Sequence, residues 1–227
     1  MPSATTEPLT IAVGDTSVSG LLQTPARPHA CYVFAHGAGA GMNHPFMANV
    51  AAGLAERSIA TLRYQFLYMQ RGSKRPDPPK LAHAAVRAAV AEAALRLPKL
   101  PLIAGGKSFG GRMTSQAQAA SPLPGVCGLA FLGFPLHPAG KPSAERAAHL
   151  ADVKIPMLFL QGTRDALAEL DQLEPVCKSP GARVTLKLFA DADHSFHVPA
   201  RTGRKDAQVL SELLDGFATW TNALVAA

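Results

Sequence analysis

Short apolar runs alternate with helical segments along this chain, and no other feature of the sequence limits its possible folds as strongly. The runs typical of strands are residues 30–35, 59–64, 102–105, 126–131, 156–161 and 184–189. Several are continuous in apolar residues, which favours strands buried on both faces of a parallel sheet. Segments with helical spacing or composition are residues 45–57, 81–97, 112–120, 143–150, 168–177 and 205–225. The pattern predicts an α/β fold with helices on both faces of the sheet.

A hairpin is expected before the first of these runs. Residues 9–13 and 18–24 are short extended segments around the turn at 14–16, and they bring the predicted, mostly parallel sheet to eight strands. Residues 65–79 are expected to form an irregular basic loop. Only about 21 residues separate the strand ending near Phe134 from the one starting at Pro156, too few for a large cap domain. We therefore expect one α/β domain over residues 1–227.

The composition excludes several classes of protein. The 227 residues are 48% hydrophobic and 17% charged, a balance that supports a full core and argues against a mainly disordered chain. The net charge of +6 is diffuse, so no nucleic-acid partner is expected. No apolar run approaches the roughly 20 residues that cross a bilayer, and the first residues lack the pattern of a secretory signal. We expect a cytoplasmic monomer or homodimer without a membrane partner.

Ser108 lies in the sequence Gly106–Lys107–Ser108–Phe109–Gly110, which has the form G-x-S-x-G. An apolar run precedes it and a helical segment follows it, as a sharp strand-to-helix turn requires. A nucleophile on such a turn has a strained backbone, and side chains two residues to either side would collide, so glycine is needed at both places. The following helix directs its N-terminus toward developing negative charge. The motif indicates a nucleophilic serine.

A serine nucleophile needs a base, and the base needs an acid to orient it. Asp165 and His194 each follow a predicted strand, so both are expected at the same edge of the sheet as Ser108. The order Ser, Asp, His is that of the α/β-hydrolase triad. Asp191 and Asp193 flank His194 and are alternatives for the acid, although their position favours a role in shaping the turn.

A negatively charged tetrahedral intermediate also needs hydrogen-bond donors. We expect one from the backbone N–H of Phe109 and the second from the glycine-rich loop after residues 30–35, where Ala38 is favoured over Gly37 and Gly39. His36 is expected to support this loop. The residues expected to line a substrate pocket are His36, Gly37, Gly39, Tyr64, Phe66, Tyr68, Met69, Arg71, Phe134 and Leu136, several of which could equally belong to the core.

Four segments resemble the small, uncapped members of the α/β-hydrolase superfamily. They are HGAGAGM at 36–42, GKSFGGR at 106–112, QGTRD at 161–165 and DADHSF at 191–196. The likeness is to the dienelactone-hydrolase-like group and to predicted hydrolases of the testis-expressed type. It implies the α/β-hydrolase fold and the triad Ser108, Asp165 and His194. A typical dienelactone hydrolase has a cysteine nucleophile, so Ser108 favours an ester or thioester over dienelactone.

The remaining motifs are weaker. Arg71, Lys74 and Arg75 form a basic cluster that is either solvated or a rim favouring acidic substrates. Cys31, Cys127 and Cys177 have no metal-binding spacing, and His194 and His197 have no recognised third ligand. No metal and no organic cofactor are expected.

Together these features predict a serine hydrolase that cleaves a small carboxylic ester or thioester through an acyl-enzyme. A binding or scaffold protein that keeps the fold without turnover is the alternative from another class. Peptidase activity is less favoured, because such enzymes usually add a large cap or propeller.

Overall fold

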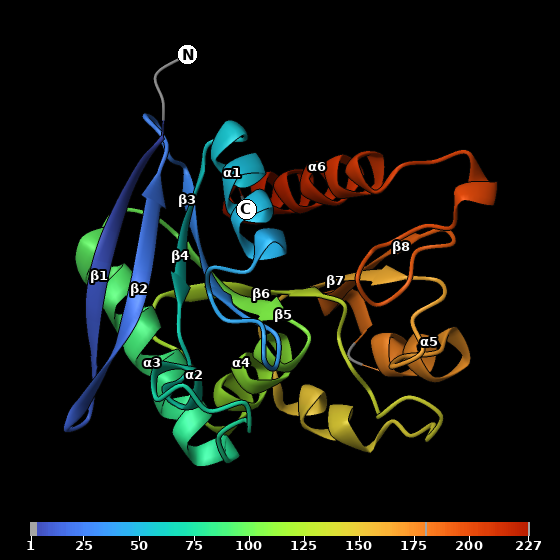
Figure 1. Ribbon diagram of the computed structural model, residues 1–227, viewed down its shortest axis with the longest axis horizontal. Coiled ribbons are helices and arrows are strands. Elements are labelled where there is room, and N and C mark those ends of the chain that lie inside the picture. The colour runs from blue at the N-terminus through green and yellow to red at the C-terminus, as the bar shows by residue number, and fades with distance from the viewer. Residues whose placement is uncertain (1–3, 180, 227) are drawn as a thin grey trace.

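The computed structural model describes residues 4–179 and 181–226, and the strands among them form one eight-stranded sheet (Figure 1). The strands are β1 (Thr5–Val13), β2 (Thr16–Thr24), β3 (Ala30–Ala35), β4 (Ile59–Tyr64), β5 (Leu102–Lys107), β6 (Val126–Leu132), β7 (Met157–Gly162) and β8 (Val184–Phe189). Their order across the sheet is β1-β2-β4-β3-β5-β6-β7-β8. The pairs β1–β2 and β2–β4 are antiparallel and all the others are parallel. The expected eight-stranded, mostly parallel sheet is confirmed.

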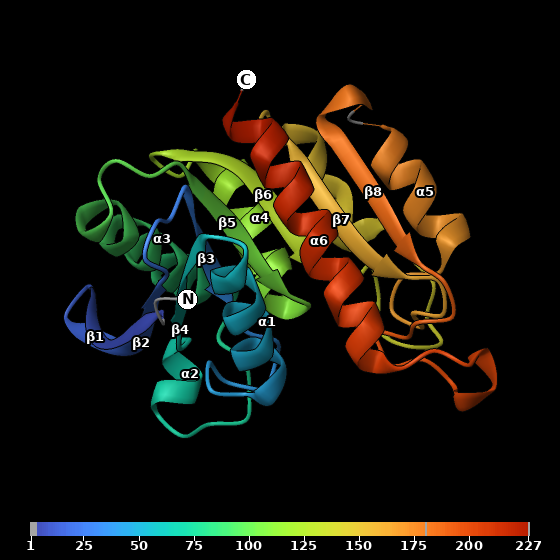
Figure 2. The same cartoon turned by 90° about the horizontal axis from the view of Figure 1, so that it is seen from above.

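Helices cover both faces of this sheet. They are α1 (Pro45–Glu56), α2 (Leu67–Gln70), α3 (Pro79–Arg96), α4 (Phe109–Ala120), α5 (Leu170–Lys178) and α6 (Asp206–Val225), with 3-10 turns η1 (Glu145–Asp152), η2 (Gly181–Arg183) and η3 (Ala200–Thr202). Helices α1 and α6 lie on one face and α3, α4 and α5 on the other (Figures 1 and 2). The apolar core is accordingly divided into two clusters, one on each side of the sheet.

Burial follows the apolar patterns of the strands. Every residue of β3 and β4 is buried, as expected for central strands that are covered on both faces. In β1 the buried residues alternate, and Leu9, Ile11 and Val13 face the core. This is the period of a strand with one solvated face. The predicted hairpin therefore forms the antiparallel edge of the sheet.

The structure corrects three details of the predicted elements. The loop at residues 65–79 contains the single-turn helix α2, which is too short to show a helical period in the sequence. Helix α4 begins directly after Ser108 and not at residue 112. The sequence pattern missed this first turn because it contains Gly110 and Gly111, which have low helix propensity. The predicted helix at 143–150 is the 3-10 segment η1.

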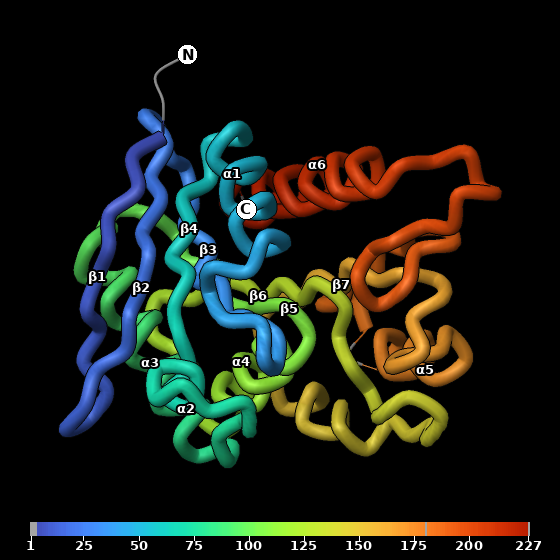
Figure 3. Tube along the Cα trace, viewed as in Figure 1, coloured from blue at the N-terminus to red at the C-terminus, as the bar shows by residue number. Residues whose placement is uncertain are grey.

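The parallel strands end at a common edge, which is where the proposed site lies. Lys107, the last residue of β5, pairs in register with Leu132 of β6, and Gly162 of β7 pairs with Phe189 of β8. The segments that follow β5, β7 and β8 therefore begin at the same end of the sheet, and the chain can be traced through them in Figure 3. Within residues 4–179 and 181–226, no helix has both the length and the apolar character needed to cross a membrane.

Candidate active site

Ser108 occupies the turn between β5 and α4 in a strained conformation. Its φ of 51° and ψ of −118° lie in a region that non-glycine residues rarely adopt. A Cβ added at Gly106 would lie 2.5 Å from the carbonyl oxygen of Ala35, and one at Gly110 would lie 2.6 Å from that same oxygen. Glycine is therefore required at both positions, because the turn packs directly against the end of β3. The Ser108 side chain does not cap α4, which leaves its hydroxyl for another partner.

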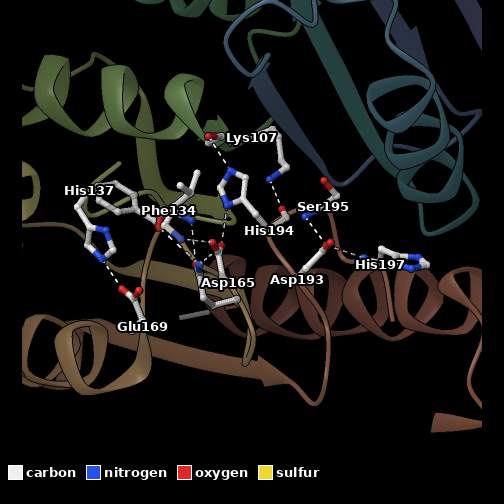
Figure 4. A network of polar contacts seen from close by, with 12 residues as sticks. Lys107, Phe134, His137, Asp165, Glu169, Asp193, His194, Ser195 and His197 are labelled. Carbon is white, nitrogen blue, oxygen red and sulfur yellow. Dashed lines mark hydrogen bonds and ion pairs between the residues drawn. The ribbon is translucent and has the colours of Figure 1, made fainter. Parts of the chain in front are cut away.

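That partner is His194, which links Ser108 to Asp165. Nε2 of His194 lies 2.8 Å from Oγ of Ser108. Nδ1 of His194 lies 2.6 Å from Oδ2 of Asp165, and Figure 4 shows this contact. Because an ionised carboxylate only accepts hydrogen bonds, Nδ1 carries the proton and Nε2 is left to accept one from the serine. The structure thus brings together three side chains that are 57 and 29 residues apart in the sequence.

Asp165 is held in place by three donors. Its side chain is fully buried. Oδ2 accepts a hydrogen bond from Nε2 of Gln161 at 2.6 Å as well as from His194, and Oδ1 accepts one from the backbone N–H of Leu167 at 2.8 Å. Gln161 is itself fixed, since its Oε1 accepts from the backbone N–H of Phe134 at 2.8 Å. Gln161 begins the segment QGTRD at 161–165, but its position near the end of an apolar strand did not by itself indicate this contact with Asp165.

Asp193 shapes the loop that carries His194. Its Oδ1 accepts hydrogen bonds from the backbone N–H groups of Ser195, at 2.7 Å, and His197, at 3.0 Å. These contacts match the turn-forming position expected for Asp193. Asp191 has a positive φ of 59° and its backbone N–H donates to Thr163, so it too serves the turn. His197 is exposed and pairs with Asp206 at the surface.

Lys107 holds the same loop from the opposite side. Its Nζ donates to the carbonyl oxygen of His194 at 2.5 Å and lies 5.5 Å and 5.9 Å from the ring centroids of Phe196 and Phe46. Burial lowers the pKa of the Lys107 ammonium to about 8, although Asp165 and Asp193 act in the opposite direction. The lysine beside Ser108 therefore anchors the backbone of His194. The sequence offered one signal for this role, which is that a charged residue, Lys107, stands between Gly106 and Ser108 in the G-x-S-x-G motif.

We expect Lys107→Met to change how stability depends on pH. An unfolded chain keeps the lysine proton up to about pH 10, whereas the folded protein releases it near pH 8. The folded state binds fewer protons in this window, so its free energy of unfolding should rise with pH relative to Lys107→Met, by at most about 2–3 kcal/mol. Urea unfolding of both proteins at pH 7, 8, 9 and 10 measures this difference. Lys80→Met, at the exposed start of α3, is the control and should leave the pH dependence unchanged.

The two backbone amides that the sequence suggests as oxyanion donors, those of Phe109 and Ala38, belong to residues that line the cavity with Ser108. The N–H of Phe109 is the first of α4, where an N–H group has no acceptor within its own helix. Among the described residues no acceptor bonds the Ala38 N–H, and both Ala38 and Phe109 line a cavity together with Ser108. The N–H of Gly39 instead donates to the Tyr68 hydroxyl at 2.9 Å. The Gly39 N–H is thus engaged within the protein, and of Ala38 and Gly37 only Ala38 lines the cavity.

His36 supports the loop after β3. It is fully buried, and its Nε2 accepts a hydrogen bond from the backbone N–H of Phe66 at 3.1 Å. Its Nδ1, which must then carry the proton, donates to the carbonyl oxygen of Gly37 at 2.8 Å. Burial lowers the pKa of His36 to about 4, so it stays neutral at physiological pH. His36 therefore supports the loop after β3 through these two hydrogen bonds.

The cavity next to Ser108 has a volume of about 370 Å³. Its lining is Ala38, Pro76, Asp77, Pro79, Ser108, Phe109, Arg112, Met113, Pro135, His137, Pro138, Arg146 and Leu167. Most of the residues expected to line a pocket are instead fully buried in the core, namely His36, Tyr64, Phe66, Phe134 and Leu136, with Tyr68 almost so. The expected pocket therefore needs correction, because apolar character alone does not separate a cavity wall from a core.

The remaining expected pocket residues also lie apart from this cavity. Met69 is packed near Gly41, and Gly37 and Gly39 belong to the loop after β3 without lining the cavity. The guanidinium of Arg71 forms an ion pair with the buried Asp77 at 2.7 Å, while Lys74 and Arg75 are exposed. The basic cluster thus does not form the wall of this cavity.

Comparison with known proteins agrees with this architecture. A family model for an alpha/beta hydrolase domain matches residues 28–222. A dienelactone hydrolase from Anabaena variabilis is 20% identical, with a TM-score of 0.77 over 96% of this chain and 97% of that one. A serine hydrolase without a lid from Xanthomonas campestris is also 20% identical, with a TM-score of 0.75 over 97% and 96% of the two chains. A serine hydrolase homologue from Coxiella burnetii has 19% identity and a TM-score of 0.76, covering 92% and 96%.

Proposed function

The chain belongs to the alpha/beta hydrolase domain family, and from this premise we propose that it hydrolyses small carboxylic esters or thioesters. In this proposal Ser108 is the nucleophile, His194 the general base and acid, and Asp165 the residue that orients His194. The backbone N–H groups of Phe109 and Ala38 stabilise the oxyanion. The enzyme would then be a carboxylesterase or thioesterase with a covalent acyl-enzyme intermediate.

One observation carries the proposal. The hydrogen-bonded chain from Ser108 through His194 to Asp165 ends at a cavity of about 370 Å³, and Ser108 is the member that lines it. The backbone strain at Ser108 adds support, because strained residues concentrate at functional sites. A serine held only for packing would not need to be placed on a histidine that is itself fixed by a buried carboxylate.

Acylation follows from these contacts. His194 accepts the proton of the Ser108 hydroxyl at Nε2 while Oγ forms a bond to the carbonyl carbon of the substrate. The carbonyl oxygen becomes an oxyanion that accepts hydrogen bonds from the two amides, and Asp165 stabilises the positive imidazolium. The tetrahedral intermediate then breaks the bond to the alcohol or thiol, which leaves with the proton of His194.

Deacylation repeats the sequence with water. His194 accepts a proton from a water molecule, whose oxygen attacks the acyl carbon of the Ser108 ester. The same amides stabilise the second oxyanion, and the bond to Oγ breaks as His194 returns the proton to Ser108. The products are a carboxylic acid and the free enzyme.

We expect short acyl chains to be the best substrates. The cavity is at the small end of the range for ligand sites, and each methylene that it leaves in water forgoes about 0.8 kcal/mol. For p-nitrophenyl esters from acetate to laurate, kcat/KM should therefore peak at about two to six carbons. Initial rates at fixed pH and ionic strength measure this series.

The outcomes separate the proposal from its rivals. A rise in kcat/KM that continued to twelve carbons would contradict a small site. Stoichiometric binding of these esters without turnover would instead favour a binding protein that has kept the hydrolase fold. Thioesters of the same acyl groups, assayed through the released thiol, decide which of the two leaving groups the enzyme prefers.

A further inference from the structure

The cavity beside Ser108 contains two arginines that the proposed reaction does not use. Arg112 lies on α4, one helical turn after Ser108, and its backbone N–H donates to the Ser108 carbonyl oxygen at 3.1 Å. Arg146 enters the same cavity from η1. Four residues of helix correspond to a rise of about 6 Å, so Arg112 is within the length of a small substrate from the nucleophile.

Arg112 lines the cavity at an electrostatic cost. Its guanidinium carbon lies 5.8 Å from the ring centroid of Phe109, which also lines the cavity. Burial and the positive charge of Arg146 lower the pKa of Arg112. The Nε of Arg112 is buried, and no hydrogen-bond partner for it occurs in the described part of the chain. A buried donor without a partner costs free energy, so this group is suited to an acceptor from outside the protein.

No carboxylate of the described residues forms an ion pair with Arg112 or Arg146. Among the described residues that line the cavity, Asp77 alone has a carboxylate, and it accepts hydrogen bonds from Arg71 at 2.7 Å and from the backbone N–H of Tyr68 at 2.8 Å.

Two histidines near the cavity, His137 and His149, contact other side chains. His137 lies against Glu169 (Figure 4). His149 is bonded to Ser115 at 2.7 Å, and burial, with Arg112 and His83 next in importance, lowers the pKa of His149 to about 4. These histidines do not neutralise a cation, and no ion pair of Arg112 or Arg146 occurs in the described part of the chain, so the positive charge of both guanidinium groups stays without a protein counter-ion.

We propose that Arg112 and Arg146 bind an anionic group, a carboxylate or a phosphate, carried by the ester substrate a few bonds from its scissile carbonyl. This inference rests on the proposed hydrolase function and narrows its substrate class to acidic esters. Planar guanidinium groups match carboxylate and phosphate oxygens with paired hydrogen bonds, and the anion offsets the repulsion between the two arginines. The residues involved differ from the basic cluster Arg71, Lys74 and Arg75, whose members point to the surface or to Asp77.

Matched ester pairs test this inference. The mono-p-nitrophenyl esters of succinate and glutarate are compared with the neutral p-nitrophenyl butyrate and valerate, and a phosphonate-terminated ester of the same length distinguishes phosphate from carboxylate recognition. The wild-type kcat/KM should be higher for the anionic member by a factor of about 10–100, the range that one or two hydrogen bonds to a charged group supply. Salt should reduce this ratio.

Variants assign the effect to the two arginines. Arg112→Met and Arg146→Met should each lower the ratio of anionic to neutral kcat/KM by about ten-fold, and Arg112→Lys should retain part of it. Arg75→Met removes the same charge from the exposed loop and should leave the ratio unchanged. A wild-type ratio near one, with the neutral esters still hydrolysed, would overturn the inference and leave the proposed function intact.

A binding measurement keeps the inference testable even without turnover. Calorimetry with glutarate on Ser108→Ala should show binding that is lost in the double variant Ser108→Ala/Arg112→Met. Absence of binding to Ser108→Ala, together with a ratio near one, would show that the arginines have no anionic ligand of this class.

Discussion

Replacing Ser108 with alanine should reduce kcat for the best short ester by a factor on the order of 10⁶, the loss that removal of a triad nucleophile produces. The variant lacks the oxygen that attacks the carbonyl, so only water acting beside His194 and the oxyanion amides remains. It should also lose reaction with a fluorophosphonate probe, which forms a bond to an activated serine oxygen. Steady-state rates and intact mass after probe treatment measure the two effects, and the wild-type protein should gain one adduct.

Ser195→Ala provides the matched control. Ser195 is exposed and adjacent to His194, and only its backbone N–H takes part in the described contacts of the loop. This variant should keep wild-type rates and the single adduct. A probe adduct that persisted in Ser108→Ala would identify a different nucleophile. Circular dichroism establishes that both variants are folded, so that a lost activity can be read as lost chemistry.

The sequence predicts the strands of this fold better than its short helices. Residues 30–35 and 59–64 are predicted with the bounds of β3 and β4, because apolar runs that end at polar residues or glycine mark a buried strand. Residues 184–189 are predicted with the bounds of β8, an edge strand of which only Phe189 is buried. Helix α2 is not predicted because it has four residues, too few to show the repeated apolar spacing that identifies a helix. The first turn of α4 is not predicted because Gly110 has low helix propensity. Glycine is required at this position by the close approach of the end of β3, and this tertiary contact outweighs the local helix propensity.

The residues of the candidate site also differ in how far the sequence predicts them. Ser108, Asp165 and His194 are predictable because each follows a strand of a parallel sheet, and the topology brings such positions together. Gln161 and Lys107 lie within the segments QGTRD and GKSFGGR, but their hydrogen bonds to Asp165 and to the His194 backbone cannot be inferred from those segments alone. Arg112 and Arg146 line the same cavity because η1 packs against α4. Side-chain pairs of this kind depend on tertiary packing, which composition and periodicity do not specify.

Replacing Asp165 with asparagine should lower kcat by a factor of about 10³–10⁴ while the protein stays folded, because the acid determines the tautomer and stabilises the charge of the base. Oδ2 of Asp165 accepts from both His194 and Gln161, and Oδ1 accepts from the N–H of Leu167. An asparagine NH₂ group at the Oδ2 position would face two donors. His194 would then carry its proton on Nε2, where it could no longer accept one from Ser108.

The other orientation of the asparagine does not avoid the conflict. It would place the NH₂ group against the N–H of Leu167, and a buried donor left without an acceptor costs about 1–3 kcal/mol. Either orientation therefore gives a loss of activity or of stability, and kcat measured together with the urea midpoint separates them. Asp193→Asn is the comparison, since Asp193 contacts backbone N–H groups of its own loop and not the imidazole of His194. Full activity in Asp165→Asn with an inactive Asp193→Asn would reassign the acid, because the hydrogen bond at Nδ1 would then be dispensable for the base.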